Sequence, residues 1–292
     1  MKLIGKALLI LVVLLLLLAA VFHERVADLY AQATPINYQL DASGILPPSE
    51  QLADAANWKS LFNGESLDGW SIKFTGSKVG ENVNNTFRAE NGVLSVNYSD
   101  WDSFEGRFGH IYTEQSYSHY IFQFEYRFVG DQVKGAGSGM SWAIRNNGAM
   151  LHAQHPNTMR LEQEFPVSIE AQLLGGLEDG ERPTANLCTP ATNVVLNGEV
   201  YRAHCTESVS KTYHGDQWVK AEFEVLGSQR IRHFINGELV FEYEQPQYDP
   251  FSVDANHIGK ATQLIDRGHI AFQAESHPTQ FRNIRLLELP AS

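Results

Sequence analysis

The chain is poor in basic residues and in helical patterns. Lys and Arg total 22 against 34 Asp and Glu, which gives a formal net charge of -12. This balance disfavours nucleic acid as a partner, because binding to phosphates needs clustered basic side chains and no basic stripe occurs. Beyond the N-terminal leader we find no long amphipathic helix, no repeat of fixed period and no low-complexity tract. A helical fold is therefore disfavoured too.

The first residues decide the expected compartment. Lys2 and Lys6 precede an uninterrupted apolar run over residues 7–22, which is the pattern of an export signal. The run is at the short end for crossing a bilayer, and the small-residue pattern at 31–33 lies well beyond it. We expect residues 1–22 to form a hydrophobic helix that is a signal peptide or an uncleaved signal anchor. The domain would then be exported, to the periplasm or the cell surface, with the membrane as a partner through this segment.

Cysteine is nearly absent. The only two are Cys188 and Cys205. In an exported chain a lone pair is more often a disulfide than a metal or redox site. We expect a disulfide that closes a loop of roughly 15 residues, which corresponds to about 3 kcal/mol in the chain-entropy model.

Turn signals are abundant after residue 57. The segment 230–244 predicts a β-hairpin, because Asn236-Gly237 suits a type I′ turn and the flanking residues are β-branched, aromatic or aliphatic. Further turn pairs are Asn63-Gly64, Asp68-Gly69, Asn91-Gly92, Asn147-Gly148, Asp179-Gly180 and Asn197-Gly198. By contrast, residues 23–56 show no sustained periodicity, so we expect a linker there with at most a short helical turn over 48–56.

Three segments alternate between apolar and polar residues, which indicates half-buried strands. They cover residues 119–129, 167–173 and 268–277. In the second, Ile169, Ala171 and Leu173 point one way, while Glu170 and Gln172 point the other. In a sandwich of two sheets, such polar faces look outward or line a groove that could hold a sugar.

Several ordered motifs resemble the 3-keto-disaccharide hydrolase domain family. They span essentially residues 57–289 and are the opening WKSLFNGESLDGW at 58–70, HIYTE at 110–114, YIFQFEYR at 120–127, GSGM at 137–140 with Arg145, IEAQLL at 169–174, KTYHGDQW at 211–218, the hairpin at 230–244, and GHIAFQ at 268–273 with FRNI at 281–284. This chain differs from a minimal member of the family in having a longer middle segment, residues 184–214, which contains both cysteines.

The resemblance implies an all-β fold, a concanavalin-like jelly-roll β-sandwich of two antiparallel sheets over residues 57–292. It also implies a hydrolase that cleaves glycosides whose C3 hydroxyl is already oxidised to a ketone. Such a ketone acidifies the C2 proton, so a base can remove it and the C1 substituent leaves by elimination before water adds. The site needs a base, donors for the enolate oxygen and an acid for the leaving group.

The candidate catalytic residues are Glu170, His152, His155 and Arg145. Glu170 is the first candidate for base or metal ligand, although a carboxylate on a sheet surface is an equal alternative. His152 and His155 are candidate acids or bases, and a solvated loop pair is the commoner reading. Arg145 is a candidate for holding an enolate, and a salt-bridge partner is its usual role.

The candidate substrate-binding residues are Gln172, Gln273, Glu275, His277 and Trp142. Gln273, Glu275 and His277 share a face by period two and could complete a groove with Gln172. An exposed strand end is the alternative. Trp142 is either a stacking platform or a core residue, and the core is the commoner place for such a ring.

An ordinary sandwich glucanase places acids at alternate positions of one strand, as Glu-x-Asp-x-Glu. Here the strand reads EAQLL from Glu170, and Glu162 and Glu164 fit a solvated edge, so a retaining mechanism with two carboxylates is disfavoured. No motif demands a cofactor, although oxygen ligands on a sheet would suit calcium. Two other functions stay open: a carbohydrate-binding sandwich without catalysis, and a surface adhesion or scaffold domain.

Overall fold

The computed structural model describes residues 40, 44–52, 57–136, 138–259 and 263–291. The predicted leader, most of the predicted linker and the expected N-terminal helix lie outside these residues. Among the described residues, no helix is long and apolar enough to cross a membrane.

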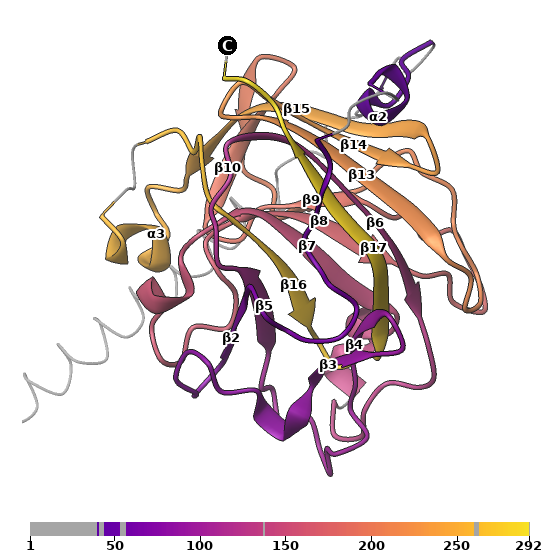
Figure 1. The fold of residues 1–292 in the computed structure, drawn as a ribbon. Coiled ribbons are helices and arrows are strands. Elements are labelled where there is room, and N and C mark those ends of the chain that lie inside the picture. The colour runs from indigo at the N-terminus through magenta and orange to yellow at the C-terminus, as the bar shows by residue number, and fades with distance from the viewer. Residues whose placement is uncertain (1–39, 41–43, 53–56, 137, 260–262, 292) are drawn as a thin grey trace, which may run out of the picture. The chain divides into compact units, whose positions relative to one another are not determined.

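Two antiparallel sheets form a β-sandwich (Figure 1), as the resemblance implied. The ten-stranded sheet runs in the order β11 (Glu199–Tyr201), β10 (Thr192–Leu196), β15 (Glu238–Tyr248), β14 (Arg230–Ile235), β13 (Val219–Leu226), β6 (His119–Phe128), β17 (Thr279–Glu288), β4 (Val93–Val96) and β3 (Phe87–Glu90), with β1 (Lys59–Ser60) paired to β17. The seven-stranded sheet runs in the order β12 (Cys205–Thr206), β9 (Asn186–Cys188), β8 (Ile169–Leu174), β7 (Asn146–Ala153), β16 (His269–Ala274), β5 (Gly109–Thr113) and β2 (Trp70–Phe74).

Helical segments are short. They are α2 (Pro48–Gln51), α3 (Val253–His257) and the 3₁₀ turns η1 (Val83–Asn85), η2 (Ser138–Ala143) and η3 (Pro156–Thr158). Helix α2 falls inside the predicted linker, where Ser49 donates a backbone hydrogen bond to Glu222 of β13. This part of the linker region therefore packs against the ten-stranded sheet.

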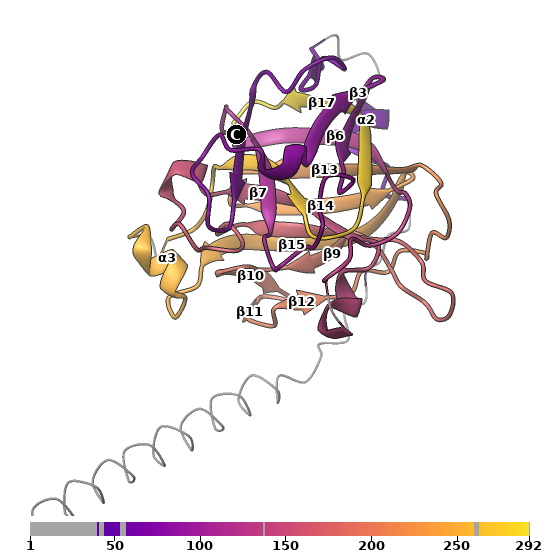
Figure 2. The ribbon, with the colours of Figure 1, turned by 90° about the horizontal axis from the view of Figure 1, so that it is seen from below.

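The predicted hairpin is present as β14 and β15. Figure 2 shows β14 beside β13, and β15 next to β14, in the ten-stranded sheet. Asn236 has φ 48° and Gly237 has φ 88°, the positive values that a type I′ turn requires. The register shifts between His233 and Phe234, where β15 carries a bulge against β14.

Aromatic rings fill the space between the sheets. Phe272 of β16 packs on Phe281 of β17 at 4.0 Å between centroids, and on Phe124 of β6 at 4.9 Å. All three are fully buried, and burial of one such ring contributes about 1.5–3 kcal/mol. Because these rings occupy the inner faces, the alternate residues of β6, β8 and β16 are directed to the outer faces of the sandwich.

Candidate active site

A row of mostly polar residues crosses the outer face of the seven-stranded sheet. In the register of this sheet Asn186 pairs with Gln172, Gln172 with Gly148, and Gln273 with His110. Residues paired across antiparallel strands share a face. The neighbouring inward residues, among them Ala171 and Phe272, belong to the core, so the row lies on the side away from it.

Gly148 lies in the middle of this row and has no side chain. A Cβ at Gly148 would lie 2.4 Å from Glu170 Oε1 and 2.7 Å from Gln273 Oε1, so a side chain there would have to displace both oxygens. Both functional side chains therefore fold over the bare backbone of β7. The predicted turn at Asn147-Gly148 is wrong: both residues lie within β7, and neither has a positive φ. Glycine is required here for close approach and not for a turn.

Two carboxyl groups meet at this place. Glu170 is only 6% exposed and Glu275 only 3%. Burial raises the pKa of Glu170 to about 8, and the nearby Gln273 amide lowers it by a smaller amount. Burial, together with the charge of Glu170, raises the pKa of Glu275 well above its usual range. Two such acids without a nearby cation will hold at least one proton at neutral pH.

The polar atoms around these carboxyls have few partners of their own. Within the described part of the chain, hydrogen bonds of regular geometry are lacking for both side-chain atoms of Gln273, both ring nitrogens of His110, both ring nitrogens of His277, and Glu275 Oε2. All four side chains are buried. Buried polar groups are normally satisfied, and an unsatisfied one costs about 1–3 kcal/mol. A cluster of them indicates groups arranged for a polar ligand.

This geometry agrees with a comparison against family models. Residues 57–287 match the 3-keto-alpha-glucoside-1,2-lyase-like domain. The chain belongs to this family. Its fold is similar to solved structures of two candidate glycosyl hydrolases from Parabacteroides distasonis. The first is 17% identical, with a TM-score of 0.48, and the alignment covers 87% of this chain and 99% of that one. The second is 16% identical, with a TM-score of 0.47, and the alignment covers 80% of this chain and 99% of that one. A carbohydrate-binding module from Bacillus subtilis is 11% identical, with a TM-score of 0.35, and the alignment covers 66% of this chain and 93% of that one. The comparison with curated proteins found no match.

In this family member an aromatic wall stands beside the polar row. Phe165 contacts His110 edge-on at 5.9 Å and Phe108 at 4.9 Å between centroids. Trp142 of η2 stacks on Phe108 at 6.4 Å and 24°. Trp142 is 47% exposed, so it is not a core residue, and the ring face away from Phe108 is open to solvent.

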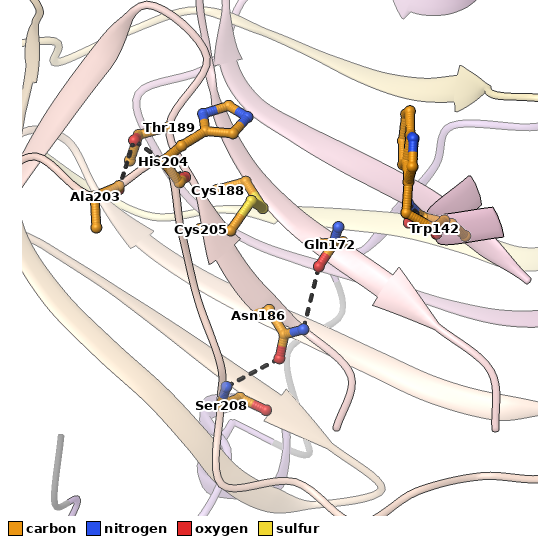
Figure 3. The surroundings of a disulfide bond; sticks show 10 residues. Trp142, Gln172, Asn186, Cys188, Thr189, Ala203, His204, Cys205 and Ser208 are labelled. Atoms are coloured by element: carbon orange, nitrogen blue, oxygen red, sulfur yellow. Dashed lines mark hydrogen bonds between the residues drawn. A yellow bond between two sulfur atoms is a disulfide. The ribbon is translucent and has the colours of Figure 1, made fainter. Parts of the chain in front are cut away.

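The predicted disulfide is confirmed, and it lies next to the site. Cys188 of β9 is bonded to Cys205 of β12, and Cys188 also pairs directly with Glu170 in the sheet register. Figure 3 shows Gln172 between this disulfide and Trp142, with its amide oxygen accepting a hydrogen bond from Asn186 at 3.2 Å. Strands β9 and β12, which belong to the longer middle segment 184–214, thus flank the site next to β8.

The two predicted histidines lie elsewhere. His152 is not a loop residue. It is the second-last residue of β7 and is buried, and its Nε2 contacts the carbonyl of Gly227, between β13 and β14, at 3.0 Å. His155 is exposed, and its Nδ1 accepts a hydrogen bond from Asn157. Neither contacts Glu170 or Gln273 among the contacts of the described residues, so sequence adjacency was a poor guide to this site.

Arg145 and His277 lie at the margin. Arg145 donates to the Gly215 carbonyl and forms an ion pair with Asp216 at 3.5 Å, which is the salt-bridge role that the sequence left open. Burial and then the charge of Arg145 lower the pKa of His277 to about 4. The period-two pattern is broken at Ser276, whose φ is 87°, so His277 does not continue the β16 face.

Sequence reasoning missed His110 and Gly148 as site residues. The sequence indicates His110 only as part of a family motif, yet it pairs with Gln273 and forms the β5 end of the row. A glycine inside an apolar strand signals close approach, and that signal was available for Gly148. For metal ions, the described residues contain no group of three or more His, Cys, Asp or Glu that could hold one, and calcium stays a prediction.

Proposed function

We propose that this protein is an exported enzyme that cleaves 3-keto-glycosides by removing the C2 proton, eliminating the C1 substituent and hydrating the product. Family membership supports the substrate class. The observation that carries the proposal is a set of buried polar side chains on the outer face of the seven-stranded sheet. Glu170 and Glu275 have raised pKa values, and the polar atoms of His110 and Gln273 lack regular hydrogen bonds within the described part of the chain. Such perturbed groups are a frequent mark of a catalytic site.

In the first step the Glu170 carboxylate takes the proton from C2. The electron pair of the C2–H bond moves onto the C3 carbonyl as an enolate, and a base of raised pKa suits this task better than an ordinary carboxylate. Glu170 lies beside Gly148, where no side chain separates it from a ring bound over β7.

In the second step the enolate collapses to a C1–C2 double bond and the C1–O bond breaks. The departing oxygen needs a proton, and Glu275 is the acid best suited to supply it, because its pKa is raised well above the usual range. Water then adds at C1 of the unsaturated ketone and gives its released proton to the Glu275 carboxylate, while Glu170 returns its proton to C2, so both groups regain their starting states. The net reaction is hydrolysis of the glycosidic bond.

The amides and the aromatic wall position the sugar. Gln172 and Gln273 flank Gly148 on β8 and β16, where their amides suit the remaining ring hydroxyls. The open face of Trp142 suits the apolar face of a second ring on the leaving side.

The test compares matched glycosides. The protein is incubated with a 3-keto-glucoside and with the same glucoside carrying an ordinary C3 hydroxyl, and release of the aglycone is measured. We expect release only from the keto sugar. Because Glu275 brings a second carboxyl near Glu170, release from both sugars would support an ordinary two-carboxylate glycosidase instead.

A second candidate is a sugar-binding domain without catalysis, which the exposed Trp142 and the flanking amides also favour. Binding of the keto sugar by calorimetry without release of the aglycone would select it. Export is part of the first proposal, supported by the leader pattern and by a disulfide that persists in oxidising compartments. Cell fractionation that found the protein in the cytoplasm with free thiols would contradict that part.

A further inference from the structure

His110 is one of the two most buried polar side chains of the row, with Gln273. It is 1% exposed and lies on β5 between Gln273 of β16 and Lys73 of β2, with which it pairs. The edge of Phe165 and the ring of Tyr112, 6.0 Å away between centroids, enclose it further. Neither ring nitrogen has a hydrogen-bond partner among the described residues.

The imidazole of His110 is held neutral. Burial lowers its pKa to about 3, and the charge of Lys73 acts in the same direction. Lys73 does not bond to the ring: its Nζ donates to the carbonyls of Phe74 and Leu161. A neutral imidazole carries one N–H donor and one acceptor, and neither is used within the fold.

The spacing suits one sugar ring. Glu170 and His110 stand on β8 and β5, separated by β7 and β16, so three strand spacings of about 4.8 Å put their backbones about 14 Å apart. The Glu170 carboxyl reaches over Gly148 into this interval. With the base on one side of the bound ring, a donor is needed on the other side, where the C3 oxygen gains negative charge.

We propose that the neutral His110 donates its ring N–H to the C3 carbonyl oxygen of the bound 3-keto sugar and holds the enolate after Glu170 removes the C2 proton. The proton stays on His110 throughout, and the stabilisation comes from a preorganised hydrogen bond in a dry site. This assignment rests on the proposed function and adds a catalytic residue to it.

The experiment isolates the enolate step. A 3-keto-1,5-anhydroglucitol has no aglycone at C1, so proton abstraction is followed on its own, as exchange of the C2 proton with D₂O measured by proton NMR. We compare the wild type with His110→Phe, which keeps a ring but lacks the donor, and with His110→Gln, which keeps an N–H. The control is His155→Phe, a change at an exposed histidine outside the site.

We expect His110→Phe to slow both exchange and aglycone release by about 100-fold, the usual effect of losing one such donor. His110→Gln should recover part of both rates, and sugar affinity should be nearly unchanged in all variants. If His110→Phe does not fold, His110→Leu serves the same test. Wild-type rates in the Phe or Leu variant would overturn this inference alone. A wild type that neither exchanges nor cleaves would overturn the proposed function and this inference together.

Discussion

The two outer faces of the sandwich follow the same alternating pattern and differ in how their polar groups are satisfied. On the ten-stranded sheet the acids have partners from neighbouring strands. Glu224 accepts two hydrogen bonds from Arg232, at 3.0 and 2.7 Å. Glu125 accepts one from Arg282 at 2.6 Å, and Arg285 donates to Gln123 at 2.8 Å.

On the seven-stranded sheet the corresponding side chains lack such partners. Burial raises the pKa of both Glu170 and Glu275, and the charge of Glu170 raises that of Glu275 further. Among the described residues neither acid forms an ion pair, and the polar atoms of His110 and Gln273 lack hydrogen bonds of regular geometry. Polar groups that satisfy one another stabilise a fold, whereas unsatisfied ones lower the free energy of unfolding. The difference distinguishes a face whose polar groups stabilise the fold from the face that carries the candidate site, although the two faces have the same alternating sequence pattern.

The sharpest test exchanges one buried acid on each face. Glu170→Gln should lower turnover by about 10²–10⁴-fold, since it removes the base, while sugar binding and folding persist. Glu224→Gln should leave turnover unchanged and lower the free energy of unfolding by about 1–3 kcal/mol, because it weakens the paired hydrogen bonds with Arg232. Single-turnover kinetics and urea unfolding measure the two effects.

The opposite pattern, with activity lost from Glu224→Gln and kept in Glu170→Gln, would show that the site lies on the ten-stranded sheet.

A second test adds a side chain at Gly148. Gly148→Ala should lower turnover by about 100-fold, because a Cβ there must displace Glu170 and Gln273 by sub-ångström to ångström shifts. Gly139→Ala is the matched control, since a Cβ at Gly139 meets no atom within 4 Å. Equal activity of the two variants would show that Glu170 and Gln273 need not lie over β7.

Removing the disulfide tests whether the stability of the seven-stranded sheet depends on this cross-link. The double change Cys188→Ala with Cys205→Ala should lower the free energy of unfolding by about 3 kcal/mol, as expected for a loop of this length. Amide hydrogen exchange should show the loss of protection first in β9 and β12 and last in β13 and β14. Uniform loss across both sheets would contradict a local role.

A pH series compares the wild type with Glu170→Gln. If Glu170 is the base, kcat/KM should rise as pH increases through about 8, where the carboxyl ionises. Since the folded-state pKa lies above the ordinary value of 4.5, the folded protein binds more protons between these values. Stability from Glu170 is therefore lost as pH rises, by up to about 1.4 kcal/mol per unit.

The Gln variant should lack this stability slope. Parallel unfolding free energies for both proteins from pH 5 to 8 would mean that Glu170 titrates normally.

The smallest expected effect concerns two tryptophans. Trp142→Ala should raise KM about tenfold for a keto-disaccharide and little for a substrate with a small aglycone, because it removes a stacking surface. Trp218 is the control: it lies between Arg127 and Arg282, at 4.6 and 4.1 Å, so Trp218→Ala should change stability and not KM. Equal KM changes would remove Trp142 from the site.

Much of the fold was predictable because strands and turns are local. The hairpin at 230–244 and the strand β6 follow from period-two patterns and positive-φ residues that lie within a few positions of one another. The Cys188–Cys205 bond followed from there being only two cysteines.

The site was less predictable because strand order is not local. Glu170, Glu275 and His110 come to one face of the same sheet only because β16 inserts between β7 and β5, and no pattern within one strand reveals that order. The same ambiguity misled the histidine prediction: His152 and His155 are close in sequence, yet His152 lies at a register shift of β7 with a φ of 51° and contacts the Gly227 carbonyl, whereas His155 lies beyond the strand and is exposed. The family motifs identified Glu170 and Gln273 without showing what surrounds them.

The short strand β12 has a consequence for assembly. It consists of Cys205 and Thr206 alone and forms one free edge of the seven-stranded sheet. Exposed sheet edges recruit strands from other molecules, and short or covalently closed edges resist this. The disulfide thus holds the two-residue strand β12 at the edge of the sheet that carries the candidate site. Reduction would uncover the longer edge of β9, and the chain would then be prone to edge-to-edge association before it unfolds.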